Sequence, residues 1–384
     1  MTAGPLAGVK VIEFAGIGPA PMCAMLLADL GATVLRLDKA GPPTAGMKRP
    51  LKYNLVLRNR HSITVDLKSA EGIAFAMELA KDADAIIEGF RPGTMEKLGL
   101  GPEAFAKINP GLVYGRMTGW GQDGPYAKMA GHDLNYIALT GALHAIGRKG
   151  QAPTPPLNLV GDYGGGSLYL AFGLVSAILS ARTTGLGQVV DAAMVDGAAS
   201  LMTSFFGLHA GSLHSTERGT NILDSGAPYY DTYECADGKY LAVAPIEEKF
   251  RAIFFKRLGL DAAEFDNGQA GQEKMRASIA SALKTRPQAE WVAHFDGTDA
   301  CVAPVLSMEE APRHAHNMAR KTFIDVDGIV QPAPAPRFSV TPAATPTPPK
   351  PADHDVPAAL SNWGMSGEQI EKWLSHTQTG QNKP

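Results

Sequence analysis

Two polar clusters that begin with glycine carry the side chains best suited to acid–base chemistry. One is Gly-His132-Asp133-Leu-Asn-Tyr over residues 131–136, and the other is Gly-Asp162-Tyr-Gly-Gly-Gly-Ser over residues 161–167. An imidazole changes its charge near neutral pH, and a run of three glycines allows a ligand to approach the backbone closely. Asp133 and Asp162 are also good N-terminal helix caps, which is the commoner role of such residues at a helix start.

A glutamate after a predicted hairpin strand, Glu247 in the segment Pro-Ile-Glu-Glu-Lys, completes this polar set. A glutamate at such a position is usually solvated, but a carboxylate can also hold a histidine in one tautomer. The three residues show no metal-ligand spacing, and the chain has no Gly-x-Ser-x-Gly motif for acyl transfer to serine. The set therefore indicates proton transfer rather than hydrolysis.

The elements that must position these clusters alternate between strand and helix. Apolar runs of strand length lie at residues 9–14, 32–37, 62–67, 85–88 and 112–117, and helical patterns lie at 22–30, 70–81, 102–108, 134–146, 164–180 and near 190–215. Alternation of this kind predicts an α/β fold, in which a parallel sheet is covered by helices on both faces.

A smaller α+β domain is predicted at residues 225–310. It opens with a hairpin around the turn Asp237-Gly238 and continues with helical patterns near 247–258, 272–284 and 288–295. The first part of the large domain then covers residues 1–190, linker helices cover 191–224, and 311–384 form a return linker and the C-terminal part of the large domain. The proline-rich residues 332–357 are expected to be extended and to run over a surface.

The first strand–turn–helix unit looks like the opening of a dinucleotide-binding domain. In Gly16-Ile-Gly18-Pro19-Ala-Pro21, however, a proline stands at the third glycine position, and both prolines lack the N–H that would hold a pyrophosphate. Prolines do fit the first turn of a helix. The unit is therefore predicted to be structural, and a nicotinamide oxidoreductase is a remote alternative.

The overall composition excludes several classes of function. A formal net charge of −3 gives no general attraction for nucleic acid or a membrane surface. The three cysteines, Cys23, Cys235 and Cys301, form neither a metal-ligand pattern nor a disulfide framework. The start of the chain shows no signal-peptide pattern, and the longest apolar stretch, residues 168–179, is too short to span a bilayer. We expect a cytoplasmic protein that binds no nucleic acid and no membrane.

Ten segments of the chain together resemble one enzyme family. They are GPLAGVKVIEFAGIGPAP, LGATVLRLDK, LRNRHSITVDLKS, EGFRPGTMEKLGLGP, MTGWGQDGP, AGHDLNYIALTGALHAIGR, PPLNLVGDYGGGS, GQVVDAAMVDGAA, APYYDTYECADGKYLAV and QPAPAPRFS. On these segments, which extend from about residue 4 to about residue 340, the chain closely resembles the α-methylacyl-CoA racemases. That family belongs to the family III CoA-transferase superfamily.

The resemblance implies a fold, an assembly and three catalytic residues. The expected fold is a Rossmann-like large domain built from both chain ends plus a small domain, in two chains that interlock into a homodimer with active sites at the interface. The family's two bases, on opposite faces of the α-carbon of a 2-methylacyl-CoA thioester, correspond to His132 and Asp162. Its glutamate, which pairs with the histidine across the interface, corresponds to Glu247. No cofactor is implied, because CoA is part of the substrate. The family's Ala-Ile-Glu-Pro-Gln-Phe reads Pro-Ile-Glu-Glu-Lys-Phe here, which adds two charges beside Glu247.

The resemblance also implies contacts with the polyanionic CoA thioester. The residues expected to bind the substrate are Lys39, Leu57, Arg58, Asn59, Arg60, Lys68, Arg91, Lys97, Gly131, Asp133, Leu134, Asn135 and Tyr136. For each basic residue taken singly, a solvated surface charge is the commoner explanation. Arg58 and Arg60 form the strongest cluster.

The expected reaction is racemisation through an enolate. His132 removes the α-proton of the (S)-substrate while protonated Asp162 supplies a proton on the other face, and the roles reverse for the (R)-substrate. Donors for the enolate oxygen are expected among the backbone N–H groups near Asp162. The nearest alternative is a family III CoA-transferase, in which Asp162 attacks the thioester and forms an acyl anhydride. His132 favours the racemase, because a transferase nucleophile needs no second base. A non-catalytic CoA-binding protein is a more distant alternative.

Overall fold

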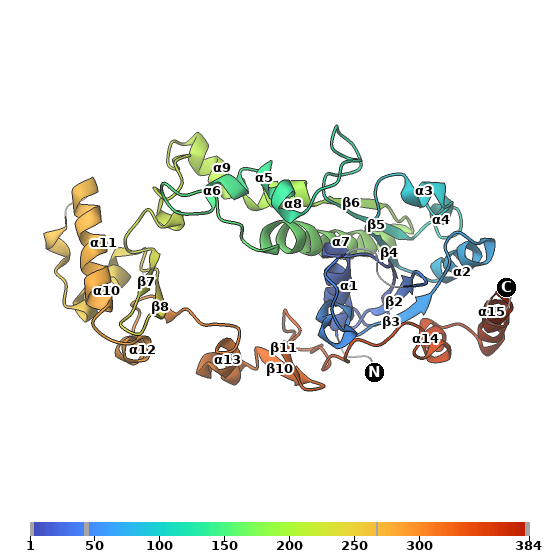
Figure 1. Ribbon diagram of the computed structural model, residues 1–384. Helices are drawn as coiled ribbons and strands as arrows, with labels where there is room; N and C mark the ends of the chain where they lie inside the picture. The colour runs from blue at the N-terminus through green and yellow to red at the C-terminus, as the bar shows by residue number, and fades with distance from the viewer. Residues whose placement is uncertain (1–3, 42–45, 266–267, 381–384) are drawn as a thin grey trace. The chain divides into compact units, whose positions relative to one another are not determined.

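The chain forms two structural units, which are described separately (Figure 1). The computed structural model describes residues 4–41, 46–265 and 268–380. The first unit combines Met1–Thr140, Leu157–Leu201 and Met318–Pro384, and the second combines Gly141–Pro156 and Met202–Asn317. The first unit is therefore built from both ends of the chain, and the second includes a short insertion before Leu157.

A six-stranded parallel sheet lies at the centre of the first unit. Its strands are β1 (Lys10–Phe14), β2 (Thr33–Asp38), β3 (His61–Thr64), β4 (Ala85–Glu88), β5 (Val113–Thr118) and β6 (Val189–Ala193). Their order in the sheet is β3-β2-β1-β4-β5-β6, and every neighbouring pair is parallel. The predicted α/β fold is confirmed. The prediction of helix from residue 190 is wrong at its start, because β6 occupies that segment.

Alternate residues of the strands build two cores, one on each face of the sheet. Ile12, Ile86 and Tyr114 point into the core that helices α2, α4, α14 and α15 cover. Val11 and Ile87 point into the core beneath α1 and α7. The bounds of these helices are α1 (Pro19–Asp29), α2 (Ala70–Ala80), α4 (Pro102–Ala106), α7 (Tyr169–Thr184), α14 (Val356–Trp363) and α15 (Gly367–Gly380). The first unit is thus a three-layer α/β/α sandwich (Figure 1).

Shorter elements complete the edge of the first unit. They are α3 (Thr94–Lys97), α5 (Asp133–Ala138), α8 (Met194–Leu201) and a β10–β11 hairpin (Phe323–Val326 and Ile329–Pro332). The helix predicted at 134–146 is broken between α5 and α6 (Ala142–Ala145). Gly141, the N-cap residue of α6, has a positive φ of 81° that a continuous helix does not include.

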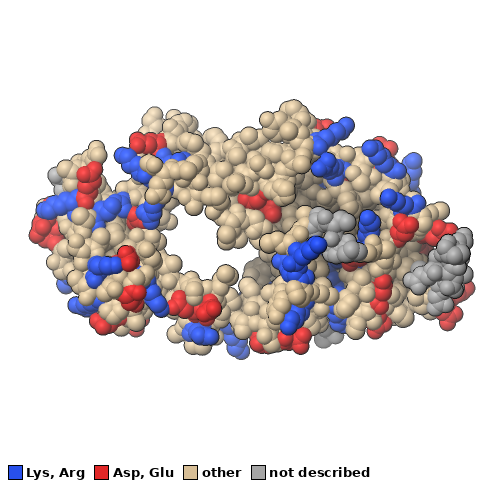
Figure 2. Space-filling view, viewed as in Figure 1, with Lys and Arg blue, Asp and Glu red and all other residues tan. Residues whose placement is uncertain are grey.

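One continuous helical stretch of the first unit, Leu159–Thr184, has the length and apolar composition to cross a membrane. It is longer than the run of residues 168–179 that the sequence alone suggested. Leu170, Leu174 and Ile178 on one side of it are buried in the core against the sheet. Its opposite side carries four exposed apolar side chains, Leu168, Phe172, Val175 and Leu179. Figure 2 shows few charged side chains over α5, α7 and α8.

The second unit contains a small antiparallel sheet with its own core. Its strands are β7 (Asp231–Glu234), β8 (Tyr240–Val243) and β9 (Val302–Pro304), in that order. The core includes Leu241, Phe254 and Trp291. The helices are α6, α9 (Thr203–Ala210), α10 (Glu248–Leu258), α11 (Gln269–Leu283) and α12 (Gln288–Phe295), and α13 (Ala315–Arg320) leads back to the first unit. The β7–β8 hairpin was predicted, whereas β9 was not.

Candidate active site

His132 and two residues near the acid–base site follow the carboxyl ends of parallel strands, and Asp162 lies beside one of these, Gly18. The turn after β1 contains Gly18, the loop after β4 contains Arg91, and the loop after β5 leads to His132. Strand order reverses between β1 and β4, and ligands of open parallel sheets bind at the carboxyl edge beside such a point. This edge of the sheet is therefore where the sequence candidates should meet.

His132 is held at the start of α5 by its own backbone. It has extended dihedral angles, and its N–H donates to Asn135 Oδ1 at 3.1 Å. Tyr136, one turn further on, donates its hydroxyl to the Gly131 carbonyl. A Cβ at Gly119 or Gly131 would stand 2.1 or 2.7 Å from the Tyr136 ring, so both positions require glycine. These contacts fix the backbone on both sides of His132 and leave its imidazole exposed.

Asp162 projects from a π-helix, Leu159–Leu168, that runs directly into α7. Asn158 Nδ2 donates to Asp162 Oδ2 at 3.1 Å, and a Cβ on Gly18 would lie 3.4 Å from the same oxygen. Burial raises the pKa of Asp162 above its ordinary value, and the neighbouring charge of Asp133 adds to the rise. The Asn158 hydrogen bond and the positive form of His132 oppose it. Asp162 and His132 are thus close enough to interact electrostatically.

The sequence did not indicate Asn158. Its spacing of four residues before Asp162 is a helical neighbour spacing, but the helix was predicted to begin only at residue 164. Because the π-helix begins at Leu159, Asn158 is its N-cap residue. An earlier helix start would have identified this hydrogen-bond donor.

The three glycines after Asp162 make room for protein rather than for a ligand. A Cβ on Gly165 would lie 2.5 Å from the backbone N of Ala198, and one on Gly166 would lie 2.9 Å from the Met194 side chain. From the other side, a Cβ on Gly197 would meet the Gly165 carbonyl oxygen at 1.9 Å. The π-helix and α8 therefore pack backbone against backbone. The expectation that these glycines admit a ligand is wrong for Gly165 and Gly166, which are both buried.

The buried side chain of Asp133 contacts the backbone of Asp162. Its Oδ1 accepts the N–H of Asp162 at 2.6 Å, and the backbone N–H of Gly161 also stabilises the ionised carboxylate. Burial raises the pKa of Asp133, and these two hydrogen bonds oppose the rise. The Asp162 N–H is therefore occupied, and any backbone donor for an enolate oxygen near Asp162 must be another amide.

Arg58 and Arg60, the strongest predicted phosphate cluster, are buried in ion pairs. Arg58 donates from Nε to Asp29 Oδ1 at 3.0 Å and from Nη1 to Gln331 Oε1 at 2.8 Å. Arg60 Nη1 lies 3.1 Å from Glu13 Oε2. The Arg58 contacts join α1 to the β10–β11 hairpin, so this segment connects the returning C-terminal chain to the N-terminal half.

Other predicted substrate-binding residues are accessible on the first unit. Lys39, Lys68, Arg91, Lys97 and Leu134 are exposed, and Leu57 and Asn59 are partly buried. Burial raises the pKa of Tyr136 to about 12, and the charge of Arg91 opposes this rise. The charges of Arg91 and Asp162 thus both act on the Tyr136 hydroxyl, in opposite directions.

Glu247 belongs to the second unit, where it is the N-cap residue of α10. Its backbone carbonyl accepts from Phe250 and Arg251, while its side chain makes no capping hydrogen bond and is exposed. Arg251 Nη1 donates to the Ile246 carbonyl at 2.8 Å, and its guanidinium lies over the Tyr229 ring. The backbone before Glu247 is therefore fixed, and its carboxylate remains available.

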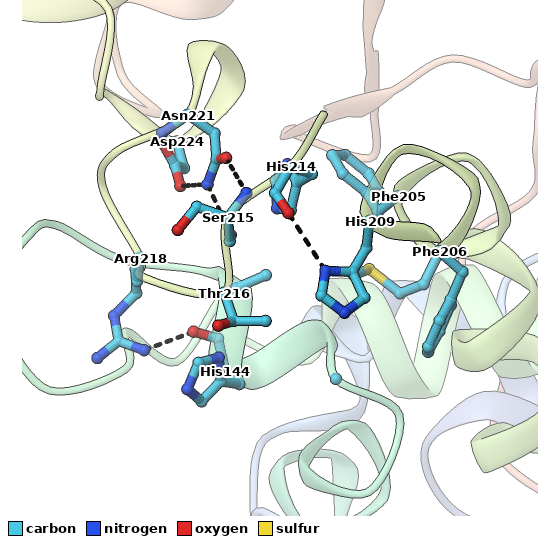
Figure 3. Close-up of a pocket in the computed structure, with 13 residues that line it drawn as sticks. His144, Phe205, Phe206, His209, His214, Ser215, Thr216, Arg218, Asn221 and Asp224 are labelled. Carbon is cyan, nitrogen blue, oxygen red and sulfur yellow. Dashed lines mark hydrogen bonds between the residues drawn. The ribbon is translucent and has the colours of Figure 1, made fainter. Parts of the chain in front are cut away.

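The second unit also contains a cavity of 160 Å³ with mostly apolar walls. Figure 3 shows Phe205, Phe206 and three histidines around it, with His209 Nδ1 3.2 Å from the His214 carbonyl oxygen. A carbonyl oxygen only accepts, so Nδ1 of His209 carries a proton in this contact. Within the described ranges of the chain, no group of three or more His, Cys, Asp or Glu could hold a metal ion.

An α/β sheet with titratable and basic side chains at its carboxyl edge is the arrangement of an enzyme for an anionic ligand. The model of CoA-transferase family III matches residues 6–356, and the chain belongs to this family. It is 42% identical to the alpha-methylacyl-CoA racemase of Mus musculus over 370 residues, and these residues make up 95% of each chain. It is 43% identical over 343 residues to the racemase of Homo sapiens, covering 88% of this chain and 87% of that one. A CAIB/BAIF family protein from Brucella suis has a similar structure, with a TM-score of 0.80 at 25% identity over 94% of this chain and 100% of that one.

Proposed function

We propose that this protein is a racemase that interconverts (R)- and (S)-2-methylacyl-CoA thioesters by 1,1-proton transfer. The observation that carries the proposal is the hydrogen bond of 2.6 Å from the Asp162 N–H to Asp133 Oδ1, which brings Asp162 next to the residue that follows His132. The family match and the two racemase relatives support the substrate class. A reaction of this kind belongs to fatty acid metabolism.

The chemistry needs one group that accepts the α-proton and one that donates a proton on the opposite face. For the (S)-substrate, His132 accepts and Asp162 donates, so Asp162 must start protonated. Burial of Asp162 favours the neutral acid and therefore suits that step. For the (R)-substrate, ionised Asp162 accepts the proton and His132 returns one. The two groups supply the proton transfers by themselves, and we propose that the enzyme uses no cofactor.

The site is completed by a second chain in this proposal. Glu247 is exposed at the start of α10, and we assign it to the His132 of the partner in a homodimer. The exposed apolar side of Leu159–Thr184 supports the association, since a row of side chains such as Phe172 and Leu179 is typical of a subunit contact. The basic residues Lys39, Lys68, Arg91 and Lys97 are accessible to the CoA phosphates. Arg58 and Arg60 would contribute through their buried ion pairs, which fix the loop that contains Leu57 and Asn59. We place the enzyme in the cytoplasm.

The proposal is tested by incubating the protein with (S)-2-methylacyl-CoA in D₂O and following α-deuterium and configuration. We expect deuterium at the α-carbon together with the (R)-product, and no racemisation with His132→Ala or Asp162→Ala. An active preparation that exchanges no α-proton would end the racemase proposal. Transfer of CoA to an added free acid, with Asp162 essential and His132 dispensable, would identify a CoA-transferase instead.

A further inference from the structure

The carboxyl group of Asp133 faces the protein interior rather than the substrate side of its helix. Asp133 is the first residue of α5 and is 7% exposed. Its Oδ1 accepts the N–H of Asp162 at 2.6 Å, and the Gly161 N–H also favours its ionised form. A Cβ on Gly161 would stand 2.5 Å from Oδ1 and 3.1 Å from the Ile137 side chain, so this approach requires glycine. Asp133 therefore joins the helix that follows His132 to the backbone of Asp162.

The second oxygen of this carboxyl group has no such role. Asp133 Oδ2 is buried and has no hydrogen-bond partner among the residues that the structure describes. An unsatisfied buried polar atom opposes folding, and an asparagine oxygen could accept the Asp162 N–H without a charge. The negative charge is thus not explained by the hydrogen bonds alone.

The charge of Asp133 acts on Asp162. The elements packed against the π-helix include α1, α5, α7 and α8. The charges that act on Asp162 are those of Asp133 and His132, both at the start of α5, and Tyr136 of α5 senses Asp162 in turn. Asn158 donates the hydrogen bond to its carboxyl group. Of these charged groups, only Asp133 disfavours the ionised form of Asp162. Burial of Asp162 acts in the same direction.

We propose that Asp133 is a positioning residue of the racemase reaction, which holds the Asp162 backbone with one oxygen and places a negative charge beside the Asp162 carboxyl group. The inference rests on the proposed function, because it concerns the same proton transfer. It assigns to the Asp133 side chain a role other than contact with the substrate. Two like charges in proximity make the protonated acid more available, which assists the step in which Asp162 donates.

The test is Asp133→Asn, which keeps the shape and the oxygen acceptor and removes the charge. The assay follows kcat/KM for the (R)-substrate from about pH 4 to pH 8, where Asp162 must be ionised to accept the α-proton. Without the neighbouring charge the pKa of Asp162 falls, so the acid limb of the profile should move to lower pH by about 0.5–1 unit. KM for the acyl-CoA should stay within about twofold of the wild-type value, since no substrate contact is lost.

Gly161→Ala is the matched control, because it disturbs the same contact and leaves the charge in place. It should lower kcat by about 10–100-fold through displacement of Asp162, with its acid limb at the wild-type pH. An Asp133→Asn limb that coincides with the wild-type limb overturns the proposal, as does a Gly161→Ala limb that moves equally far. A large rise in KM with Asp133→Asn and an unmoved limb would show a substrate contact instead.

Asp162→Ala, run in parallel, separates this inference from the proposed function. If the wild type exchanges no α-proton, the proposed function itself fails, whatever Asp133→Asn does. If Asp162→Ala racemises as fast as the wild type, Asp162 is not an acid–base group, and the inference about Asp133 fails with that assignment. If Asp162→Ala is inactive while Asp133→Asn keeps the wild-type pH profile, only the inference about Asp133 fails.

Discussion

Glu88 is a buried carboxyl group whose ionisation should oppose folding above neutral pH. It is 4% exposed at the end of β4, where its Oε2 accepts the Phe90 N–H at 2.7 Å and Arg116 Nε lies 3.8 Å from its Oε1. Burial raises the pKa of Glu88 to about 7, against the opposing effects of that hydrogen bond and of Arg116. In an unfolded chain the pKa of a glutamate is about 4.3.

The sign follows from proton linkage. The folded protein holds the Glu88 proton up to a higher pH than the unfolded chain does, so the free energy of unfolding falls as pH rises from about 4 to about 7. A pKa difference of about 2.7 at 1.36 kcal/mol per pKa unit gives a loss of about 3–4 kcal/mol from this group. Glu88→Gln cannot ionise and should lack this loss, while its amide oxygen can still accept the Phe90 N–H.

The assay is urea unfolding at pH 5 and pH 8 at one protein concentration, followed by circular dichroism. The fall in the free energy of unfolding between the two pH values should be smaller in Glu88→Gln than in the wild type by about 3 kcal/mol. Glu96→Gln is the control, because Glu96 pairs with the same Arg116 but has a lowered pKa. Its contribution is lost only at acidic pH, so this variant should follow the wild type between pH 5 and pH 8. Equal falls in the wild type and Glu88→Gln would refute the argument.

Two further predictions concern packing and the buried ion pairs. Gly165→Ala should lower the free energy of unfolding by about 1–3 kcal/mol by forcing the π-helix away from α8; Gly207→Ala, where an added Cβ meets nothing within 4 Å, should not. A Gly165→Ala protein as stable as the wild type in urea unfolding would contradict the assigned contact. Arg58→Ala should cost about 3–5 kcal/mol by leaving buried Asp29 unpaired, whereas Lys97→Ala should leave stability unchanged. If acyl-CoA binding to Arg58→Ala is weakened while its unfolding curve is not, Arg58 contacts the ligand instead of stabilising the unit.

The sheet could be predicted where its strands are buried and apolar. β4 and β5 are buried along their whole length, and apolar runs in the sequence marked both. β6 is an edge strand with exposed or partly exposed residues over its first half, so it has no such run and was taken for helix. The β10–β11 hairpin was not predicted, although Asp327-Gly328 between its strands is the same turn signal as in the β7–β8 hairpin.

The sequence indicated residues for the candidate site but not the contacts that hold them in place. His132 and Asp162 could be chosen from the sequence, but the contact that joins their segments, between the Asp162 N–H and Asp133 Oδ1, spans 29 residues and no local pattern indicates it. Burial of Arg58 and Arg60 depends on partners at Asp29 and Glu13, which no local pattern connects to them. The π-helix was not predictable either, because its glycines are explained by α8, more than twenty residues later in the chain.

In the proposed mechanism, the turn after β1 lies beside a proton-transfer group, whereas a similar turn in other α/β folds binds a phosphate. In such turns the amides of a helix N-terminus stabilise an anion, and a carboxylate placed there would ionise more readily. Here α1 begins with Pro19 and includes Pro21, so two of its first three residues have no N–H to donate. The Asp162 carboxyl oxygen that lies beside Gly18 is bonded to Asn158 rather than to a row of amides. With few donors, partial burial and the charge of Asp133 nearby, this carboxyl group retains its proton more readily than an ordinary aspartate. The prolines that argue against a pyrophosphate site are therefore the same residues that suit an acid able both to give and to take a proton.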